Sequence, residues 1–208
     1  MVITNIGLQK KDNGRFNLEV DGRFVCSISA TTIAIYTLYK DKEISEEQLN
    51  EIIKKEIENR FFDRALTLVS ASPKTKRQVE MYLKQLAFKK KGLWFEEGLD
   101  LENVFERIIE KLVKYKYIDD KEYATLFVES RLKNKPRGKQ VLISELISKG
   151  VDIHIAKEVV DKLVVDTHEL IVKAFKKRFR DTKFDAKNRK HVDFLLRKGF
   201  DWDDICKI

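Results

Sequence analysis

The side chains with the clearest chemical potential are lysines and arginines gathered in three runs. Residues 74–91 hold seven basic residues and one acid, residues 131–139 hold five basic residues and no acid, and residues 171–199 hold 11 basic residues and three acids. The whole chain carries a formal net charge of +8. Because gathered cations attract a polyanion whereas interspersed charges cancel, this pattern favours a polyanionic partner. Solvated helix faces rich in lysine are the alternative explanation.

Residues suited to catalysis or metal binding do not form a recognisable site. Asp119 and Asp120 are adjacent carboxylates, but Asp119 with Glu122 three residues later has the spacing of a helix start. Acids in a first helical turn also suit the helix dipole, so we interpret both as structural and not as an acid–base pair. The histidines His154, His168 and His191 lack mutual four-residue spacing and a nearby cysteine, so we expect surface or partly buried roles and no metal. Phosphate-cradling glycine loops and nucleophile motifs are also missing. We therefore predict a binding protein, not an enzyme, that needs no cofactor.

The cysteines and the distribution of apolar residues indicate the cellular compartment in which the protein occurs. Cys26 and Cys206 could form at most one bridge, which is a poor disulfide framework, so we expect both to be reduced. No apolar run approaches the roughly 20 residues of a membrane helix, and residues 1–11 lack the apolar stretch of a signal peptide. The sequence predicts a cytoplasmic protein that does not associate with membranes.

The first 44 residues predict a small sheet covered by a helix. Alternating apolar residues indicate three strands, with turns at residues 12–14 and 21–22, where Asn, Asp and Gly tolerate positive φ. Such a sheet is marginal alone and needs cover on its apolar face. Residues 29–40 have helical spacing and supply that cover. We therefore expect a three-stranded antiparallel meander plus one helix over residues 1–44.

The remainder of the chain contains an internal repeat of helical segments. Residues 75–88, 138–151 and 188–201 each begin with basic residues and carry apolar residues three or four apart. The last two close on Lys-Gly-apolar, where Gly ends a helix in the left-handed conformation. A helical stripe precedes each segment, at residues 61–70, 120–132 and 167–180, and another follows, at residues 101–112, 152–163 and 201–208.

Because one unit of three short helices is too small to bury a full core, neighbouring units should stack. We predict a mainly α protein whose tandem three-helix repeats form an elongated curved array. The predicted parts are a linking helix and first unit at residues 45–118 with an insertion at 89–100, a second unit at 119–165, and a third unit at 166–208 with a short last helix. Within the insertion, we expect Trp94 and Phe95 to pack locally.

Three helix starts carry the spacing of a capping box, in which a side chain accepts from the backbone three residues later. The pairs are Ser45 with Gln48, Thr75 with Gln78, and Asp119 with Glu122. These polar residues therefore have structural roles that need no chemistry.

The repeat brings the basic residues into equivalent positions. If equivalent helices stack side by side, equivalent helix starts line up, and their cations form one stripe that binds phosphate. The predicted stripe comprises Lys74, Lys76, Arg77, Arg131, Lys133, Lys135, Arg137, Lys139, Lys176, Lys177, Arg178, Arg180, Arg189, Lys190, Arg197 and Lys198.

The central segment resembles a known family. The strings YIDDKEYATLFVESR at 117–131, PRG at 136–138 and ELISKGV at 145–151 are similar to the signature of the RecX family of bacterial recombination regulators. The resemblance covers residues 45–208, and the strand-rich start is similar to the N-terminal extension of some longer members. Lys116 stands where the family has Gly, so we expect the preceding helix to end less sharply.

The resemblance implies a regulator of RecA, the recombinase that polymerises on single-stranded DNA, with roles in DNA repair and the SOS response. Members are expected to lie in the filament groove, touch protein and DNA, and suppress ATP hydrolysis, strand exchange and coprotease activity. We expect a monomer whose partners are the RecA filament, single-stranded DNA and double-stranded DNA. Two alternatives stay open: a general nucleic-acid-binding repeat protein independent of RecA, and a scaffold whose charge only solubilises it.

Overall fold

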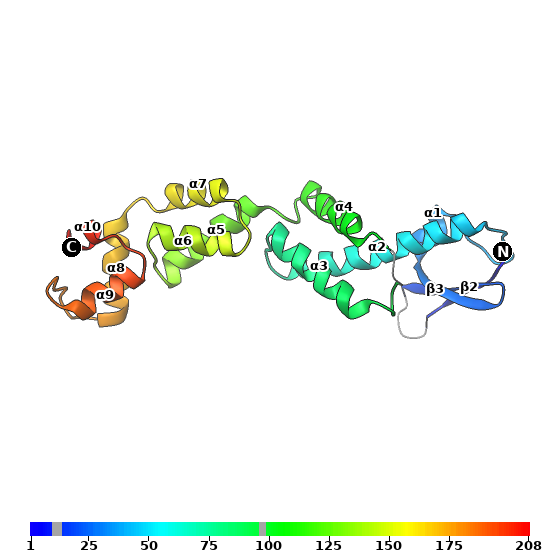
Figure 1. Ribbon diagram of the computed structural model, residues 1–208, viewed down its shortest axis with the longest axis horizontal. Helices are drawn as coiled ribbons and strands as arrows, with labels where there is room; N and C mark the ends of the chain where they lie inside the picture. Colours follow the sequence, from blue (N-terminus) through cyan, green and yellow to red (C-terminus); the bar gives the residue numbers. More distant parts are fainter. Residues whose placement is uncertain (10–13, 96–98) are drawn as a thin grey trace. The chain divides into compact units, whose positions relative to one another are not determined.

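The computed structural model describes residues 1–9, 14–95 and 99–208 of the chain (Figure 1). Two compact units are present, one made of Met1–Thr67 and Leu83–Ile108, the other of Leu68–Tyr82 and Ile109–Ile208. The predicted class is confirmed, because the chain is mainly helical with one small antiparallel sheet at its N-terminus. None of the described helices is both long and apolar enough to cross a membrane.

The N-terminal sheet has the predicted order. β1 (Ile3–Leu8), β2 (Arg15–Val20) and β3 (Arg23–Ser29) pair antiparallel with their neighbours in the chain. Asp21 and Gly22 connect β2 to β3 with φ values of 50° and 76°, which is the conformation the predicted turn requires. The turn predicted at residues 12–14 lies mostly outside the described residues.

Two helices cover this sheet, and the longer one was not assigned that role from the sequence. α1 (Ala30–Ile35) ends well before residue 40. Just beyond its end, Thr37 takes a φ of 47°. α2 (Glu46–Ala71) contributes Leu49 and Ile52 to the core formed with the sheet. The predicted helix at 29–40 is therefore only half as long as expected, and α2 supplies the remaining cover.

α2 also joins two segments that were expected as separate helices. The linking helix and the stripe at residues 61–70 form one continuous helix of 26 residues. Its start is the predicted capping box, in which the Gln48 amide nitrogen donates to the Ser45 hydroxyl and the Ser45 amide donates to the Gln48 side chain, each over 3.1 Å. Continuity follows because residues 57–61 contain neither Gly nor Pro.

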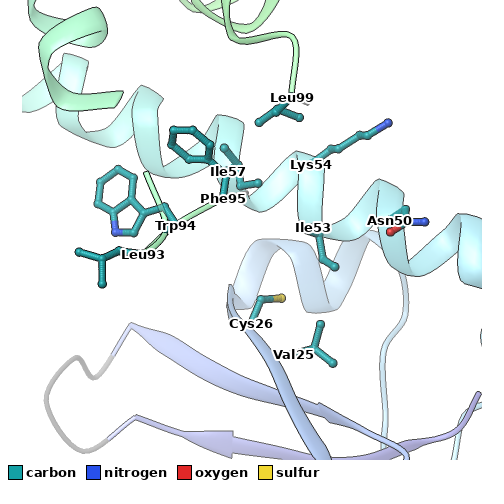
Figure 2. Close-up of a pocket in the computed structure, with 11 residues that line it drawn as sticks. Val25, Cys26, Asn50, Ile53, Lys54, Ile57, Leu93, Trp94, Phe95 and Leu99 are labelled. Atoms are coloured by element: carbon teal, nitrogen blue, oxygen red, sulfur yellow. The ribbon is translucent and has the colours of Figure 1, made fainter. Parts of the chain in front are cut away.

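The insertion is anchored by aromatic packing, as predicted. The rings of Trp94 and Phe95 lie 5.5 and 5.9 Å from the ring of Phe61, which is fully buried. Phe105 approaches the same ring at 5.2 Å from another side. Figure 2 shows Trp94 and Phe95 beside α2. Part of the predicted insertion, residues 96–98, lies outside the described residues.

The other helices follow the repeat closely. Their bounds are α3 (Lys76–Lys90), α4 (Leu101–Lys114), α5 (Asp120–Asn134), α6 (Lys139–Ser148), α7 (Ile153–Leu163), α8 (Thr167–Phe179), α9 (Arg189–Arg197) and α10 (Trp202–Ile205). α5, α6 and α7 share one core, which includes Val128, Leu142 and Val160. α8, α9 and α10 share another, with Phe175 and Leu195. The middle helices of the three predicted units are therefore α3, α6 and α9.

One histidine departs from its expected place. His191 is only 5% exposed, although we expected the histidines at the surface or partly buried. Its ring lies 4.9 Å from the ring of Phe175 and 4.7 Å from that of Phe179, and its Nδ1 accepts from the Asp185 backbone over 3.2 Å. A buried imidazole is tolerated here because an amide satisfies its nitrogen and aromatic rings surround it.

Candidate nucleic-acid interface

Consecutive middle helices meet end to end. The start of α3 contacts the end of α6, a contact we call the first junction, and the start of α6 contacts the end of α9, the second junction. This differs from the side-by-side stacking expected from the sequence. The basic residues at a helix start therefore meet those at the end of the following middle helix, which the repeat alone did not indicate.

The first junction is built on Thr75 and Gly150. The Thr75 hydroxyl donates to the Lys149 carbonyl over 2.6 Å, and Thr75 is fully buried. Its capping box with Gln78 is confirmed, since the Gln78 amide donates to the Thr75 hydroxyl over 3.2 Å. Gly150 has a φ of 91°, and a Cβ atom added there would lie 2.4 Å from Cβ of Arg77. Glycine is therefore required for the two helix ends to approach.

The second junction repeats this design with two glycines. The Gly138 amide donates to the Lys198 carbonyl over 2.9 Å. A Cβ atom added at Gly138 would lie 1.7 Å from the Gly199 carbonyl oxygen, and one added at Gly199 would lie 2.2 Å from a methyl group of Val141. Gly199 has a φ of 82°, so both predicted Lys-Gly helix ends adopt the left-handed conformation.

Four cations gather at the second junction, and we call them the cation cluster: Lys135, Arg137, Lys177 and Lys198. Burial, followed by the charges of Arg137, Lys135 and Lys177, lowers the pKa of Lys198. Among the described residues, none of the four forms an ion pair with a carboxylate. The protein thus holds uncompensated positive charge in one place, which disfavours the free state and favours an anionic ligand.

The cluster is assembled from four helices. Lys135 follows the end of α5, Arg137 precedes the start of α6, and Lys198 ends α9 with its ammonium 5.2 Å above the ring of Phe194. Lys177 comes from α8 and donates to the Asn134 carbonyl. The Nε atom of Arg137 is buried with no hydrogen-bond partner. A buried donor without an acceptor is costly, so the position of Arg137 lowers the stability of the folded chain.

The first junction has balanced rather than positive charge. It borders a cleft of about 810 Å³ whose cationic lining residues are Lys76, Arg77, Lys116 and Lys121 and whose acidic ones are Glu80, Asp119, Asp120 and Asp152. Asp120 accepts from the Lys76 amide over 2.9 Å. Asp119 accepts from the amides of Lys121 and Glu122, as predicted for a helix start. Charges in this cleft balance, so it is a weak attractor for a polyanion.

Several other residues of the predicted stripe have partners within the chain. Arg131 donates to Glu145 over 2.8 Å and lies 4.8 Å from the ring centre of Phe127. Lys139 pairs with Asp161 over 2.9 Å and Arg189 with Asp193 over 3.5 Å. Lys74 donates to the Ser72 hydroxyl. The remaining members are exposed outside the cluster: Lys133, Lys176, Arg178, Arg180, Lys190 and Arg197.

A cavity in the N-terminal unit is less suited to chemistry. It measures about 430 Å³ and is lined by Cys26, Ile53, Ile57 and Trp94 among others (Figure 2). Burial, and secondarily the charge of Glu56, raises the pKa of Cys26 to about 11. The thiol therefore stays protonated and is a poor nucleophile. Among the described residues, no cluster of side chains could hold a metal ion.

One basic residue and a set of acids at the first junction were not predicted from the sequence. Lys149 belongs to the first junction, and its ammonium lies 5.8 Å from the ring centre of Phe127. Its match to Lys198 in the repeat was visible and could have identified it. The acids of the first-junction cleft come from segments far apart in the sequence, so their neutralising effect had no local signal.

Comparisons with known proteins all lead to the same family. Residues 1–45 match the family described as regulatory protein RecX N-terminal domain, and residues 119–160 match the one described as RecX, second three-helix domain. The regulatory protein RecX of Bacillus velezensis is 30% identical over 98% of this chain and 74% of its own length. That of Clostridium acetobutylicum is 29% identical over 99% of this chain and 94% of its own length.

Solved structures agree with the sequence relatives. A crystal structure of regulatory protein RecX aligns with a TM-score of 0.72 at 22% identity, covering 98% of this chain and 96% of that one. The crystal structure of RecX from Lactobacillus salivarius aligns with a TM-score of 0.56 at 25% identity, covering 74% and 94%. The fold of this chain is therefore that of these proteins.

Proposed function

Because this chain belongs to the RecX family of regulatory proteins, we propose that it regulates RecA by binding the filament that RecA forms on single-stranded DNA. The bound protein lies in the filament groove and suppresses ATP hydrolysis, strand exchange and coprotease activity. It acts in the cytoplasm as a monomer, without chemistry of its own, and also binds double-stranded DNA. The RecA partner is implied by the resemblance of residues 117–151 to the family signature.

The cation cluster is the observation that carries this proposal. Four cations without carboxylate partners among the described residues match a chain of phosphates, because each contact releases a counterion held by the nucleic acid. Lys and Arg contacts to phosphate fix position without reading sequence. A regulator that must act anywhere along a filament needs this kind of contact.

The test compares two variants that lose the same charge. In the cluster variant, Lys135, Arg137, Lys177 and Lys198 are replaced by Gln. In the control variant, the same replacement is made at Lys133, Lys176, Lys190 and Arg197, which are exposed and lie outside the cluster. We expect the wild type to lower ATP hydrolysis by RecA filaments, the control variant to do so at nearly the same concentration, and the cluster variant to need at least tenfold more protein.

Two results would count against the proposal. If filament-bound RecA hydrolyses ATP at the same rate with and without excess protein, the regulatory target is wrong. If both variants weaken inhibition equally, the cluster has no special role and the sixteen-residue stripe is the better description of the interface.

A general nucleic-acid-binding protein is the second candidate, since phosphate contacts do not depend on RecA. It predicts equal affinity for bare single-stranded DNA and for RecA filaments, with a steep fall as salt rises. Titration of both ligands at two salt concentrations separates the candidates, because a RecA regulator binds the filament more tightly.

A further inference from the structure

A second surface feature lies where α4 ends, and it uses residues that the predicted stripe does not include. Residues 114–117 have the sequence Lys-Tyr-Lys-Tyr, and all four are exposed. The side chains of Tyr115 and Tyr117 are 63% and 49% exposed. Aromatic rings that alternate with cations are the combination by which proteins hold single strands.

The backbone under these side chains is fixed. The amides of Tyr117 and Ile118 both donate to the Leu112 carbonyl, over 2.8 and 3.3 Å. Lys116 has a φ of 59°, and Ile118 is 2% exposed, so it anchors the turn in the core. The rings therefore project from a turn that is already ordered, which lowers the entropy cost of binding.

Three other tyrosines of the chain contact side chains of the protein itself. The Tyr36 hydroxyl donates to Glu51 over 2.9 Å, the Tyr39 ring lies 5.8 Å from the Lys42 ammonium, and the Tyr123 ring stacks on Phe127. In the described part of the chain, neither the Tyr115 side chain nor the Tyr117 side chain makes a hydrogen bond or a ring contact. Folding thus gains little from these two rings, and their faces stay open to a ligand.

We propose that Tyr115 and Tyr117 stack on the bases of a single-stranded nucleic acid while Lys114 and Lys116 contact the flanking phosphates. Stacking tolerates any sequence because every base has an aromatic face. A duplex keeps its bases paired and stacked inside, so it cannot use these rings. This inference rests on the proposed function for the class of ligand, and adds contact with bases to the phosphate contacts of the cation cluster.

Lys116 connects this surface to a larger feature. It lines the first-junction cleft together with Lys76 and Arg77. The cleft is balanced in charge and would not attract a strand strongly by itself. A strand held by the two rings would, however, contact the cations that line the cleft. Stacking therefore supplies the affinity that the balanced charges of the cleft do not.

The test uses the full chain and oligonucleotides without RecA. Fluorescence anisotropy measures binding of a labelled single strand and of an abasic strand with the same length and charge. We expect the wild type to prefer the base-bearing strand about tenfold, which corresponds to the stacking of one base or more. Tyr115→Ala with Tyr117→Ala removes this preference, whereas Tyr115→Phe with Tyr117→Phe retains it because the rings remain.

Tyr39→Ala is the matched control, since Tyr39 is 58% exposed but lies in the other unit, and it should leave the preference intact. Equal wild-type affinity for the two strands, or a preference that survives the double alanine change, overturns the inference. An RNA strand of the same sequence should bind as the DNA does, because stacking ignores the sugar. A wild type that shows no base preference but still inhibits filaments refutes only this inference. A wild type that shows the base preference but does not inhibit filaments refutes only the proposed function.

Discussion

The first and second junctions share the same end-to-end packing of helices but differ in charge. In each, the start of one middle helix bonds to the carbonyl of a Lys-Gly helix end, with Thr75 donating to Lys149 in the first and Gly138 to Lys198 in the second. The first borders a cleft with equal numbers of cationic and acidic lining residues, four of each. The second holds four cations, and burial followed by the charges of the other three lowers the pKa of Lys198.

This difference separates what the repeat needs from what function needs. The end-to-end contact depends on glycine and on backbone hydrogen bonds, because any side chain at these positions meets neighbouring atoms. Charges around the contact are not required for it, so they can diverge between units. We therefore expect changes in glycine to alter stability at both junctions, and changes in charge to alter binding mainly at the second.

The largest expected effect on stability comes from Gly138→Ala. The new methyl group would meet backbone atoms of Gly199, which cannot move without displacing the end of α9. Overpacking of this kind costs about 3 kcal/mol of unfolding free energy. Urea unfolding followed by circular dichroism measures the loss.

Gly150→Ala is the matched change at the first junction. Its methyl group would lie 2.4 Å from Cβ of Arg77, a milder overlap than the 1.7 Å at Gly138, and the φ of 91° adds backbone strain. Overlap and strain together lower the unfolding free energy by about 2 kcal/mol, less than the loss at Gly138. A loss at Gly150 as large as that at Gly138 would show that the two junctions are equally rigid, contrary to the geometry described above.

A second prediction contrasts two arginines whose partners differ. Arg137→Met removes a buried Nε without a hydrogen-bond partner and one of four like charges, so the unfolding free energy should rise by about 1 kcal/mol. The same change should weaken polyanion binding and lower the slope of log affinity against log salt by about 1. Urea unfolding and a salt titration of binding to single-stranded DNA measure the two effects.

Arg131→Met provides the control, because Arg131 is paired with Glu145 and stacked on Phe127. Here stability should fall by about 1 kcal/mol while the salt slope stays unchanged. If both arginines change stability and slope in the same direction, the distinction between paired and unpaired cations does not describe this surface.

A third prediction concerns pH and Lys198. Burial and then the nearby cations lower its pKa in the free protein. A bound polyanion favours the charged ammonium, so affinity should fall as pH rises through this lowered pKa, below the value of about 10.4 for an ordinary lysine. The unfolded chain holds more protons in the same window, so stability should rise with pH there.

Lys198→Arg is the control for this pH effect, since arginine stays charged throughout. Binding to single-stranded DNA is measured by anisotropy at a series of pH values below about 10.4, the ordinary pKa of lysine. The wild type should lose affinity over this range and the arginine variant should lose much less. Parallel curves for the two proteins would assign the pH dependence to another group.

Most of the elements could be predicted from local sequence because their causes are local. Alternating apolar residues indicated the strands, the Ser45 and Thr75 capping boxes indicated helix starts, and Gly150 and Gly199 indicated helix ends. The single helix α2 was predicted as two, because a change of apolar stripe does not interrupt a helix that contains no breaker.

The candidate site was harder to predict because its properties come from contacts between distant residues. Basic runs identified all four members of the cation cluster, but not that Arg131 and Lys139 are paired with Glu145 and Asp161. These acids lie 14 and 22 residues away in the sequence. Sequence spacing could count the charges but could not say which of them already had partners.

The end of α4 shows how a family pattern can mislead about geometry. Lys116 stands where the family has Gly, and we expected a less sharp helix end. That expectation was wrong, because Lys116 adopts a φ of 59° and its amide donates to the Val113 carbonyl over 2.9 Å. The buried Ile118 and the hydrogen bonds to Leu112 impose the turn whichever residue occupies position 116.

The smallest expected effect therefore comes from Lys116→Gly, which removes strain beside the first junction. A side chain in the left-handed region costs about 1 kcal/mol, and glycine removes this cost. The greater flexibility of the unfolded chain with glycine offsets part of the gain, so stability should rise by about 0.5 kcal/mol. Lys114→Gly, at the last helical position of α4, should instead lower stability by about 0.5 kcal/mol. Urea unfolding of both variants measures the two signs. A loss at both positions would mean that the turn stores no strain, and that the lysine fits the left-handed conformation as well as glycine does.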